Sequence, residues 1–298
     1  MPARWCIAPD GSKVSFEDAP AYFESRGIMP SYAVKSVLGD TEGEGSFNVR
    51  PSDVNPKFTC RRQRVWMAGH DYGMNPLQAE GMLEGSGFHS QLGAMEIEVP
   101  SQPTTNLLFV GSDGEIVDKN GPNRLEVCGV PMRGRIDWLF EDRIEDLKTK
   151  TPFWAVKFGA KGSGERACAY IWEPKSDEDD ILGWTIQLSI YRVLREKEGK
   201  PAPTQGRVWR RYGGVKADQP RWKRFDFPLL DEAGLEGVVG EWMRGLSKGL
   251  TEAKLDSEAW KLVEADGREM VGSKGNYWQC DRCPCKSQCF TLEGLDIW

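Results

Sequence analysis

The sequence has no long run of apolar residues. No stretch approaches the roughly 20 apolar residues that a membrane-crossing helix needs, and the opening residues, MPARWCIAPDGSKVSF, lack the apolar centre of a secretory signal. We therefore expect no membrane segment and a cytoplasmic location. In a reducing cytoplasm, cysteines that cluster in sequence are more often metal ligands than disulfide partners.

The chain also lacks an excess of basic residues. Its net charge is −6, so bulk attraction to nucleic acid is not indicated. Local charge is different: CRRQR (60–64) and the stretch at 207–224 are basic, whereas KSDEDD (175–180) is acidic. Local charge matters more than the sum, although taken alone such stretches are usually solvated surface.

Hydrophobic periodicity predicts one α/β core with terminal additions in this chain of 298 residues. We expect helices over 21–38, 179–199 and 231–250. We expect strands over 93–100, 206–214 and 221–230, and a set of strands over 124–150 with a turn at 141–143.

An acidic cluster lies in the centre of the sequence, in GRIDWLFEDRIEDLKTK. Asp146 and Lys148 are two apart, so on a strand they point to the same face. A hairpin would bring Asp137 to them. Two carboxylates that face one point repel each other unless a cation lies between them, and Mg²⁺ takes oxygen ligands of this kind. With a lysine beside them, they suit metal-assisted hydrolysis of a phosphodiester. A DLK triplet alone is more often a surface ion pair.

Two further segments carry polar residues of interest. EGSGFHSQLG places His89, one of only two histidines, after Gly85 and Gly87. QLSIY places Gln187 and Tyr191 four apart, on one face of a predicted helix. Each of these features alone would be read as structural.

Together, GSGFH, GRID, EDLK and QLSIY resemble the motifs of the RecB-like branch of the PD-(D/E)XK nucleases, in the same order and with similar spacing. The resemblance implies an α/β, restriction-endonuclease-like core with a mixed sheet flanked by helices. It implies a metal-dependent DNA exonuclease that acts on single strands or DNA ends with Mg or Mn. It also implies metal ligation by His89, Asp137, Asp146 and the Leu147 carbonyl, catalysis by Lys148, and orientation of the lysine and DNA by Gln187 and Tyr191.

Four of the eight cysteines lie in YWQCDRCPCKSQCF (277–290). The tail resembles that of the iron–sulfur members of this family, which include the exonuclease of CRISPR adaptation and the AddB nuclease domain. In these, one upstream cysteine joins a C-x2-C-x5-C tail, and the match implies a [4Fe–4S] cluster that staples the C-terminal tail, held by Cys60, Cys280, Cys283 and Cys289. Four thiolates also suit a structural zinc, but the missing second C-x2-C pair favours iron–sulfur.

The fifth clustered thiol, Cys285, is predicted to be spare, because it lies outside the C-x2-C-x5-C spacing, and we expect it to point away from Cys283. We read Cys6, Cys128 and Cys168 as isolated. The predicted organisation is an N-terminal extension at 1–50 and a nuclease domain at 51–298.

The basic and aromatic stretches CRRQRVW, RVWRRY and RWKRF are expected to follow phosphates and stack bases of a DNA strand. Two alternatives remain open at this point. One is a non-catalytic DNA-binding subunit, with protein partners, of a larger DNA-processing or CRISPR-adaptation complex. The other is a zinc-bound nucleic-acid-binding module.

Overall fold

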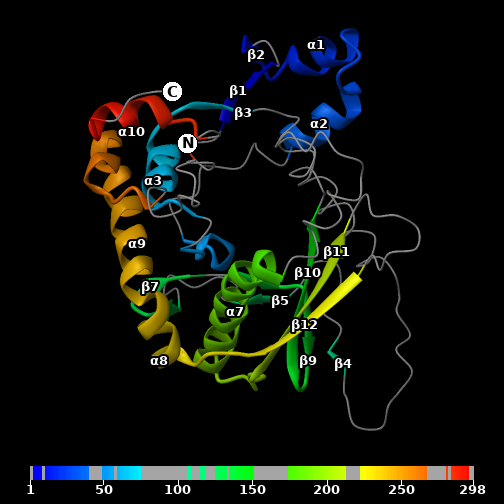
Figure 1. The fold of residues 1–298 in the computed structure, drawn as a ribbon, viewed down its shortest axis with the longest axis vertical. Helices are drawn as coiled ribbons and strands as arrows, with labels where there is room; N and C mark the ends of the chain where they lie inside the picture. Colours follow the sequence, from blue (N-terminus) through cyan, green and yellow to red (C-terminus); the bar gives the residue numbers. More distant parts are fainter. Residues whose placement is uncertain are drawn as a thin grey trace. The chain divides into compact units, whose positions relative to one another are not determined.

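The computed structural model describes residues 3–8, 11–39, 49–56, 59–74, 107–108, 115–117, 125–132, 134–150, 174–212, 222–266, 280 and 283–294. The chain divides into two compact units (Figure 1). Unit 1 consists of Met1–Val49, Phe58–Leu83 and Glu241–Trp298. Unit 2 consists of Arg50–Lys57 and Glu84–Gly240. The acidic motifs therefore belong to unit 2, and the clustered cysteines belong to unit 1.

A five-stranded mixed sheet forms the centre of unit 2, in the order β12-β11-β10-β9-β4. Strand β10 runs parallel to β11, and the other pairs are antiparallel. A parallel pair needs a crossover connection, and helix α7 (Pro174–Lys197) supplies it. The strands are β4 (Leu107–Leu108), β9 (Trp138–Phe140), β10 (Arg143–Lys150), β11 (Gln205–Tyr212) and β12 (Trp222–Pro228). The strands predicted after residue 137 are thus confirmed, with the turn at 141–142.

Helix α7 packs on one face of this sheet. Alternate residues of β12 are buried, and the ring of Phe225 lies 5.2 Å from that of Trp184 on the helix. The helix ends where Gly199 takes a left-handed φ of 70°. The amide of Lys200 then donates to the carbonyl of Arg195 at 3.0 Å, which satisfies one of the last carbonyls of the helix.

Short elements complete the described part of unit 2. A tight hairpin turns at Cys128 and Gly129, whose φ angles of 53° and 72° are both left-handed, as a type I′ turn requires.

The helix predicted over 231–250 is interrupted by a π-helical stretch, because Gly234, Gly237 and Gly240 weaken it. These elements are β5 (Glu115–Val117) paired with β8 (Gly134–Ile136), β6 (Glu126–Val127) paired with β7 (Val130–Pro131), η1 (Pro51–Asp53), α8 (Glu232–Leu235) and η2 (Glu236–Gly240).

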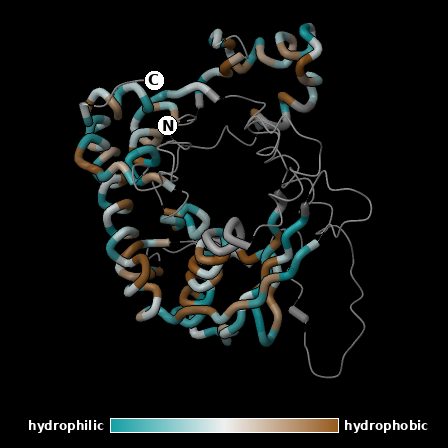
Figure 2. The backbone as a smooth tube through the Cα atoms, viewed as in Figure 1, coloured by the Kyte–Doolittle hydropathy of each residue, from teal (hydrophilic) through white to brown (hydrophobic). Residues whose placement is uncertain are grey.

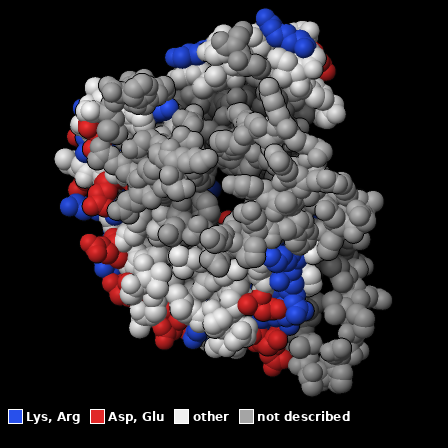
Figure 3. Space-filling view, viewed as in Figure 1, with Lys and Arg blue, Asp and Glu red and all other residues white. Residues whose placement is uncertain are grey.

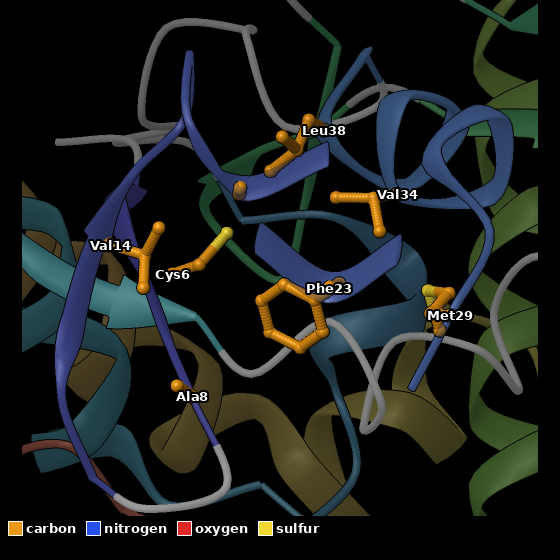
Figure 4. Close-up of a cluster of buried hydrophobic side chains, with 8 residues drawn as sticks. Cys6, Ala8, Val14, Phe23, Met29, Val34 and Leu38 are labelled. Atoms are coloured by element: carbon orange, nitrogen blue, oxygen red, sulfur yellow. The ribbon is translucent and has the colours of Figure 1, made fainter. Parts of the chain in front are cut away.

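Unit 1 contains a small sheet in the order β2-β1-β3 with two helices beside it. Its core joins Cys6, Val14, Phe23 and Val34, all buried (Figure 4). The helix predicted over 21–38 is two helices, since Gly27 takes a left-handed φ of 64° between them. The elements are β1 (Ala3–Ile7), β2 (Lys13–Ser15), β3 (Tyr72–Met74), α1 (Ala19–Ser25) and α2 (Ser31–Gly39).

Helices α3 (Arg61–Gly69) and η3 (Ser257–Leu262) pack against α9 (Glu241–Ala253). Helix α9 buries Met243, Leu246 and Leu250 at helical spacing and leaves polar residues between them (Figure 2). Helix α10 (Lys286–Leu292) follows in the cysteine-rich tail. Within the described ranges, no helix combines the length and apolar composition of a membrane span.

Candidate active site and thiol cluster

Two carboxyl groups meet at the junction of β8, β9 and β10. Asp137 lies between β8 and β9, and Asp146 lies on β10, where the neighbouring pair Trp138 and Glu145 are in register. Asp137 hydrogen-bonds to Asp146 and accepts a bond from the Leu147 amide. Burial, followed by the bond and the charge of Asp146, raises the pKa of Asp137 to about 8. The predicted pairing of the two acids is confirmed.

Lys148 lies beside these acids. Its Nζ is 2.5 Å from Oδ2 of Asp146 and donates to Oε1 of Gln187 at 3.2 Å. The amide nitrogen of Gln187 donates in turn to the hydroxyl of Tyr191 at 3.3 Å. The Lys148 side chain is 30% exposed, whereas that of Asp146 is 6% exposed. The lysine is therefore held from two sides while keeping access to solvent.

The donor chemistry here fits a divalent cation. A buried carboxyl group (Asp146) and a half-buried one (Asp137) that share a hydrogen bond are an arrangement that a doubly charged ion would stabilise. The other predicted ligand side chain, His89, lies outside the described residues. Within those residues, no three His, Cys, Asp or Glu side chains are arranged to hold a metal. The described residues thus supply two carboxylates and do not by themselves form a complete set of metal ligands.

The basic and aromatic residues of β11 and β12 divide between the two faces of the sheet. Arg207 and Trp209 donate to the buried carboxylate of Glu145, at 3.2 Å each, on the face opposite Asp146. Arg224 pairs with Asp226 at 2.8 Å on that same face. Lysine, arginine and acidic side chains lie together over this part of the molecule (Figure 3). Arg207 and Trp209 are therefore not part of the candidate site, because strand residues alternate between faces, and the expected contacts of the basic stretches with DNA stay a prediction.

Sequence reasoning missed a third group, on the same face as Lys148. Arg210, which is buried, places Nη2 2.5 Å from Oδ2 of Asp180, and its guanidinium lies 4.7 Å from the centre of the Trp184 ring. Asp180 closes the acidic stretch KSDEDD, which we read as solvated surface. The spacing of Asp180, Trp184, Gln187 and Tyr191 was the available signal, since all four fall on one helix face.

Five cysteines gather in unit 1. Cys60 is the N-cap of α3, and Cys285 is the N-cap of α10. Burial, followed by the charges of Cys283, Cys60 and Cys289, raises the pKa of Cys280 to about 12. The upstream cysteine thus lies near the tail, as predicted. The sulfurs interact through their charges, although no three described thiols converge as ligands of one metal.

Cys285 does not point away from Cys283. Their sulfurs are 3.2 Å apart, so the expectation of opposite faces is wrong. Residues two apart lie on one side even of an extended chain, and the backbone here also turns. The Cys283 amide donates to the Cys280 carbonyl at 3.0 Å, and the Lys286 amide donates to the Cys283 carbonyl at 3.1 Å. The bond from Cys285 lowers the pKa of Cys283, and the same bond, followed by burial, raises that of Cys285.

Two arginines link the segments that carry the thiols. The Arg61 amide donates to Asp266 at 2.8 Å, and its guanidinium also contacts Glu264. Arg62, which is buried, donates through Nε to the Val263 carbonyl at 2.7 Å. Its Nη1 lies 2.5 Å from Glu293 and 3.4 Å from the Cys289 sulfur. The polypeptide itself therefore holds α3 against the chain around 263–266 and 289–293.

No family model matches the sequence, and no curated protein matches it. Among solved structures, the chain is similar to the crystal structure of SSO0001, at 14% identity and a TM-score of 0.37, over 87% of this chain and 94% of that chain. It is similar to an alkaline exonuclease (LHK-Exo) from Laribacter hongkongensis, at 12% identity and a TM-score of 0.35, over 72% and 92% of the two chains. The structure of LHK-Exo in complex with dAMP is similar at 14% identity and a TM-score of 0.36, over 73% of this chain and 93% of that chain. Likenesses this low decide nothing about function, which depends on the side chains of unit 2.

Proposed function

We propose that the protein is a metal-dependent DNA nuclease, acting as an exonuclease on single strands or ends. One observation carries the proposal: Asp137, Asp146 and Lys148 meet on one face of the sheet, with Gln187 holding the lysine. A binding module would not need a buried and a half-buried carboxyl group side by side, because their desolvation costs free energy that the single charge of Lys148 does not fully offset, as the raised pKa of Asp137 indicates.

Each side chain has a separate role in this proposal. Asp137 and Asp146 hold the divalent ion, with His89 and the Leu147 carbonyl completing the set as the family resemblance implies. When bound, the ion lowers the pKa of a water and stabilises charge on the phosphate. Lys148, steered by Gln187, orients the attacking water and neutralises charge on the phosphate. Tyr191 fixes the orientation of the Gln187 amide.

The thiols have a structural role in the proposal. Cys60, Cys280, Cys283 and Cys289 hold a [4Fe–4S] cluster, or a zinc ion in its place. The choice of Cys283 over Cys285 is supported by their shared hydrogen bond, since Cys285 keeps its proton and Cys283 is the readier ligand.

The test is cleavage of labelled single-stranded DNA with and without Mg²⁺ or Mn²⁺. Asp146→Asn keeps the side-chain size but removes the charge, and cleavage should fall by roughly 10²-fold or more. Lys148→Ala should abolish cleavage while DNA binding, which rests on many phosphate contacts, persists. Asp142→Asn, on an aspartate that is 59% exposed in the neighbouring turn, is the matched control and should cleave normally. Full activity in Asp146→Asn would remove that carboxylate from the site.

Labels at the 5′ and 3′ ends, together with a circular single strand, would then give polarity and the need for an end. Persistent DNA binding without any cleavage would favour the non-catalytic binding subunit instead.

A further inference from the structure

One face of α7 carries a row of polar and aromatic side chains, and only part of this row contacts Lys148. Asp180, Trp184, Gln187 and Tyr191 follow one another at intervals of four, three and four residues, which places them on one side of a helix. The second half of the row reaches Lys148 through Gln187. The first half, Asp180 and Trp184, holds Arg210.

The two halves are in register with two neighbouring strands. Lys148 on β10 and Arg210 on β11 are direct partners in the parallel ladder, about 4.8 Å apart. Three residues of helix, from Trp184 to Gln187, rise about 4.5 Å. Trp184 can therefore lie over Arg210 while Gln187 lies over Lys148. The contact of Trp184 with Phe225 on β12 agrees with a helix that crosses the strands.

We propose that Arg210, held by Asp180 and Trp184, is a positioning residue for Lys148. Its ion pair fixes α7 along the β10–β11 ladder, and the fixed helix places the amide of Gln187 on the lysine. The inference rests on the proposed nuclease function, because the lysine needs a set orientation only if it acts on a phosphate and a water.

An ion pair is a costly way merely to attach a helix. Arg210 is 5% exposed, and burying an ion pair contributes no more stability than apolar residues of similar size would. Buried apolar side chains lie on the same face of the sheet, with Val208 two residues earlier and Phe225, the partner of Val208, on the next strand. Unlike apolar contacts, a forked guanidinium on a carboxylate and a ring fixes one direction. Register is the property that the ion pair adds.

A double-mutant cycle on the cleavage rate tests the inference. Arg210→Gln should lower kcat by between about 10- and 100-fold and leave KM within about twofold, because the substrate is not touched. In a Gln187→Ala background, Arg210→Gln should lower kcat little further, because both changes act through the same amide. Equal losses in both backgrounds would overturn the inference. Arg210→Lys, which keeps the charge without the fork, should restore stability more than kcat.

Arg207→Gln is the matched control. Arg207 lies on the same strand, and its ion pairs with Glu145 and Asp226 are on the other face. Arg207→Gln should lower the free energy of unfolding, as Arg210→Gln does. Its effect on kcat should be small, and it should be the same in the wild-type and Gln187→Ala backgrounds.

A readout that needs no activity separates this inference from the nuclease proposal. The NMR signal of the Lys148 side chain should shift in Arg210→Gln and stay in place in Arg207→Gln. An unmoved signal in Arg210→Gln would overturn the positioning role even in a protein that cleaves nothing. A shifted signal in a protein without cleavage would uphold it and reject the nuclease.

Discussion

Asp137 and Asp146 are the residues for which burial has the clearest chemical effect. Burial and the neighbouring Asp146 raise the pKa of Asp137 to about 8 even with the charge of Lys148 nearby, so at neutral pH and without metal Asp137 keeps a proton. A divalent ion must displace that proton before it can be held by both oxygens. Metal affinity and proton affinity therefore compete at one pair of side chains.

This competition predicts a pH dependence of metal binding. The pKa of Asp137 is raised to about 8, so Mn²⁺ affinity should rise by roughly tenfold per pH unit from pH 6 and level off above about 8. Titration calorimetry at several pH values, in buffers of different ionisation enthalpy, measures both the affinity and the proton released. In Asp137→Asn the affinity should be weak and its pH slope lost. Equal affinity at pH 6 and pH 8 in the unaltered protein would contradict the assignment.

The same group should make the metal-free protein sensitive to alkali. Because the folded pKa of Asp137 lies above its ordinary value of 3.8, its contribution is fully present below that value. It is lost as the pH rises towards about 8. Metal should reverse the loss, because it stabilises the ionised pair.

Residue-level expectations held where they depended on local spacing. Asp146 and Lys148 are two residues apart on a strand and lie on one face, as expected. Gln187 and Tyr191 are four residues apart on a helix and also lie on one face. The expectation that Cys285 points away from Cys283 was wrong for a different reason, because residues two apart lie on one side even of an extended chain. The chain around Pro284 also turns, and no periodic pattern gives the direction of a side chain in a turn.

At the element scale, helices α3 and α9 pack closely at a glycine of α9. A methyl group on Gly249 would lie 2.8 Å from side-chain carbons of both Val65 and Val263. Gly249→Ala should gain about 1 kcal/mol of helix propensity but lose 1–3 kcal/mol, roughly, through overpacking. The net loss in the free energy of unfolding should be about 1 kcal/mol, measured by urea denaturation.

Two companions make that test specific. Gly237→Ala meets open space and should be neutral or stabilising. Val65→Ala should relieve part of the clash, so the double variant should be more stable than the sum of the single effects predicts. Strict additivity would show that the two side chains do not collide.

The elements of unit 2 were largely predictable, because β9, β10, α7, β11 and β12 follow clear periodic patterns. The division of arginines between the two faces of β11 was also readable, since Arg207 and Arg210 are three apart. No pattern in the sequence predicted the contact of Arg210 with Asp180. The two residues are 30 positions apart, and their contact depends on how α7 crosses the strands.

For the whole molecule, the thiol cluster makes the most direct prediction. Prepared without oxygen, the protein should be coloured by iron–sulfur charge transfer, whereas zinc would leave it colourless. Cys60→Ser should lose the colour and lower the Tm, because one corner of the site is gone and metal binding contributes to folding. Cys285→Ser should keep both. The measurements are visible absorbance, iron and sulfide content, and thermal unfolding.

The reverse result would change the ligand set. If Cys285→Ser bleached the protein and Cys283→Ser did not, the pair would have exchanged roles, which their 3.2 Å separation makes a sharp comparison. If Cys60→Ser kept its colour, the tail alone would hold the cluster.

The composition of unit 1 could not be foreseen from local pattern. It joins residues 61–62 to 263–266 and 289–293, and such pairings depend on tertiary contacts between distant segments rather than on periodicity. The sequence showed which cysteines match a known spacing and did not show that Arg61 and Arg62 connect the same segments.

The discontinuity of unit 1 has a consequence for the order in which the chain can fold during synthesis. Arg61 and its partner Glu264 are 203 residues apart, and at roughly 5–20 residues per second a ribosome needs on the order of 10–40 s to make the second after the first. Unit 2, whose segments are complete by Gly240, can begin to fold in that interval. Throughout it the thiol of Cys60 exists while the cysteines at 280–289 have yet to be made. For Cys60 to join the proposed cluster, its thiol must therefore stay reduced until residues 280–289 have been made.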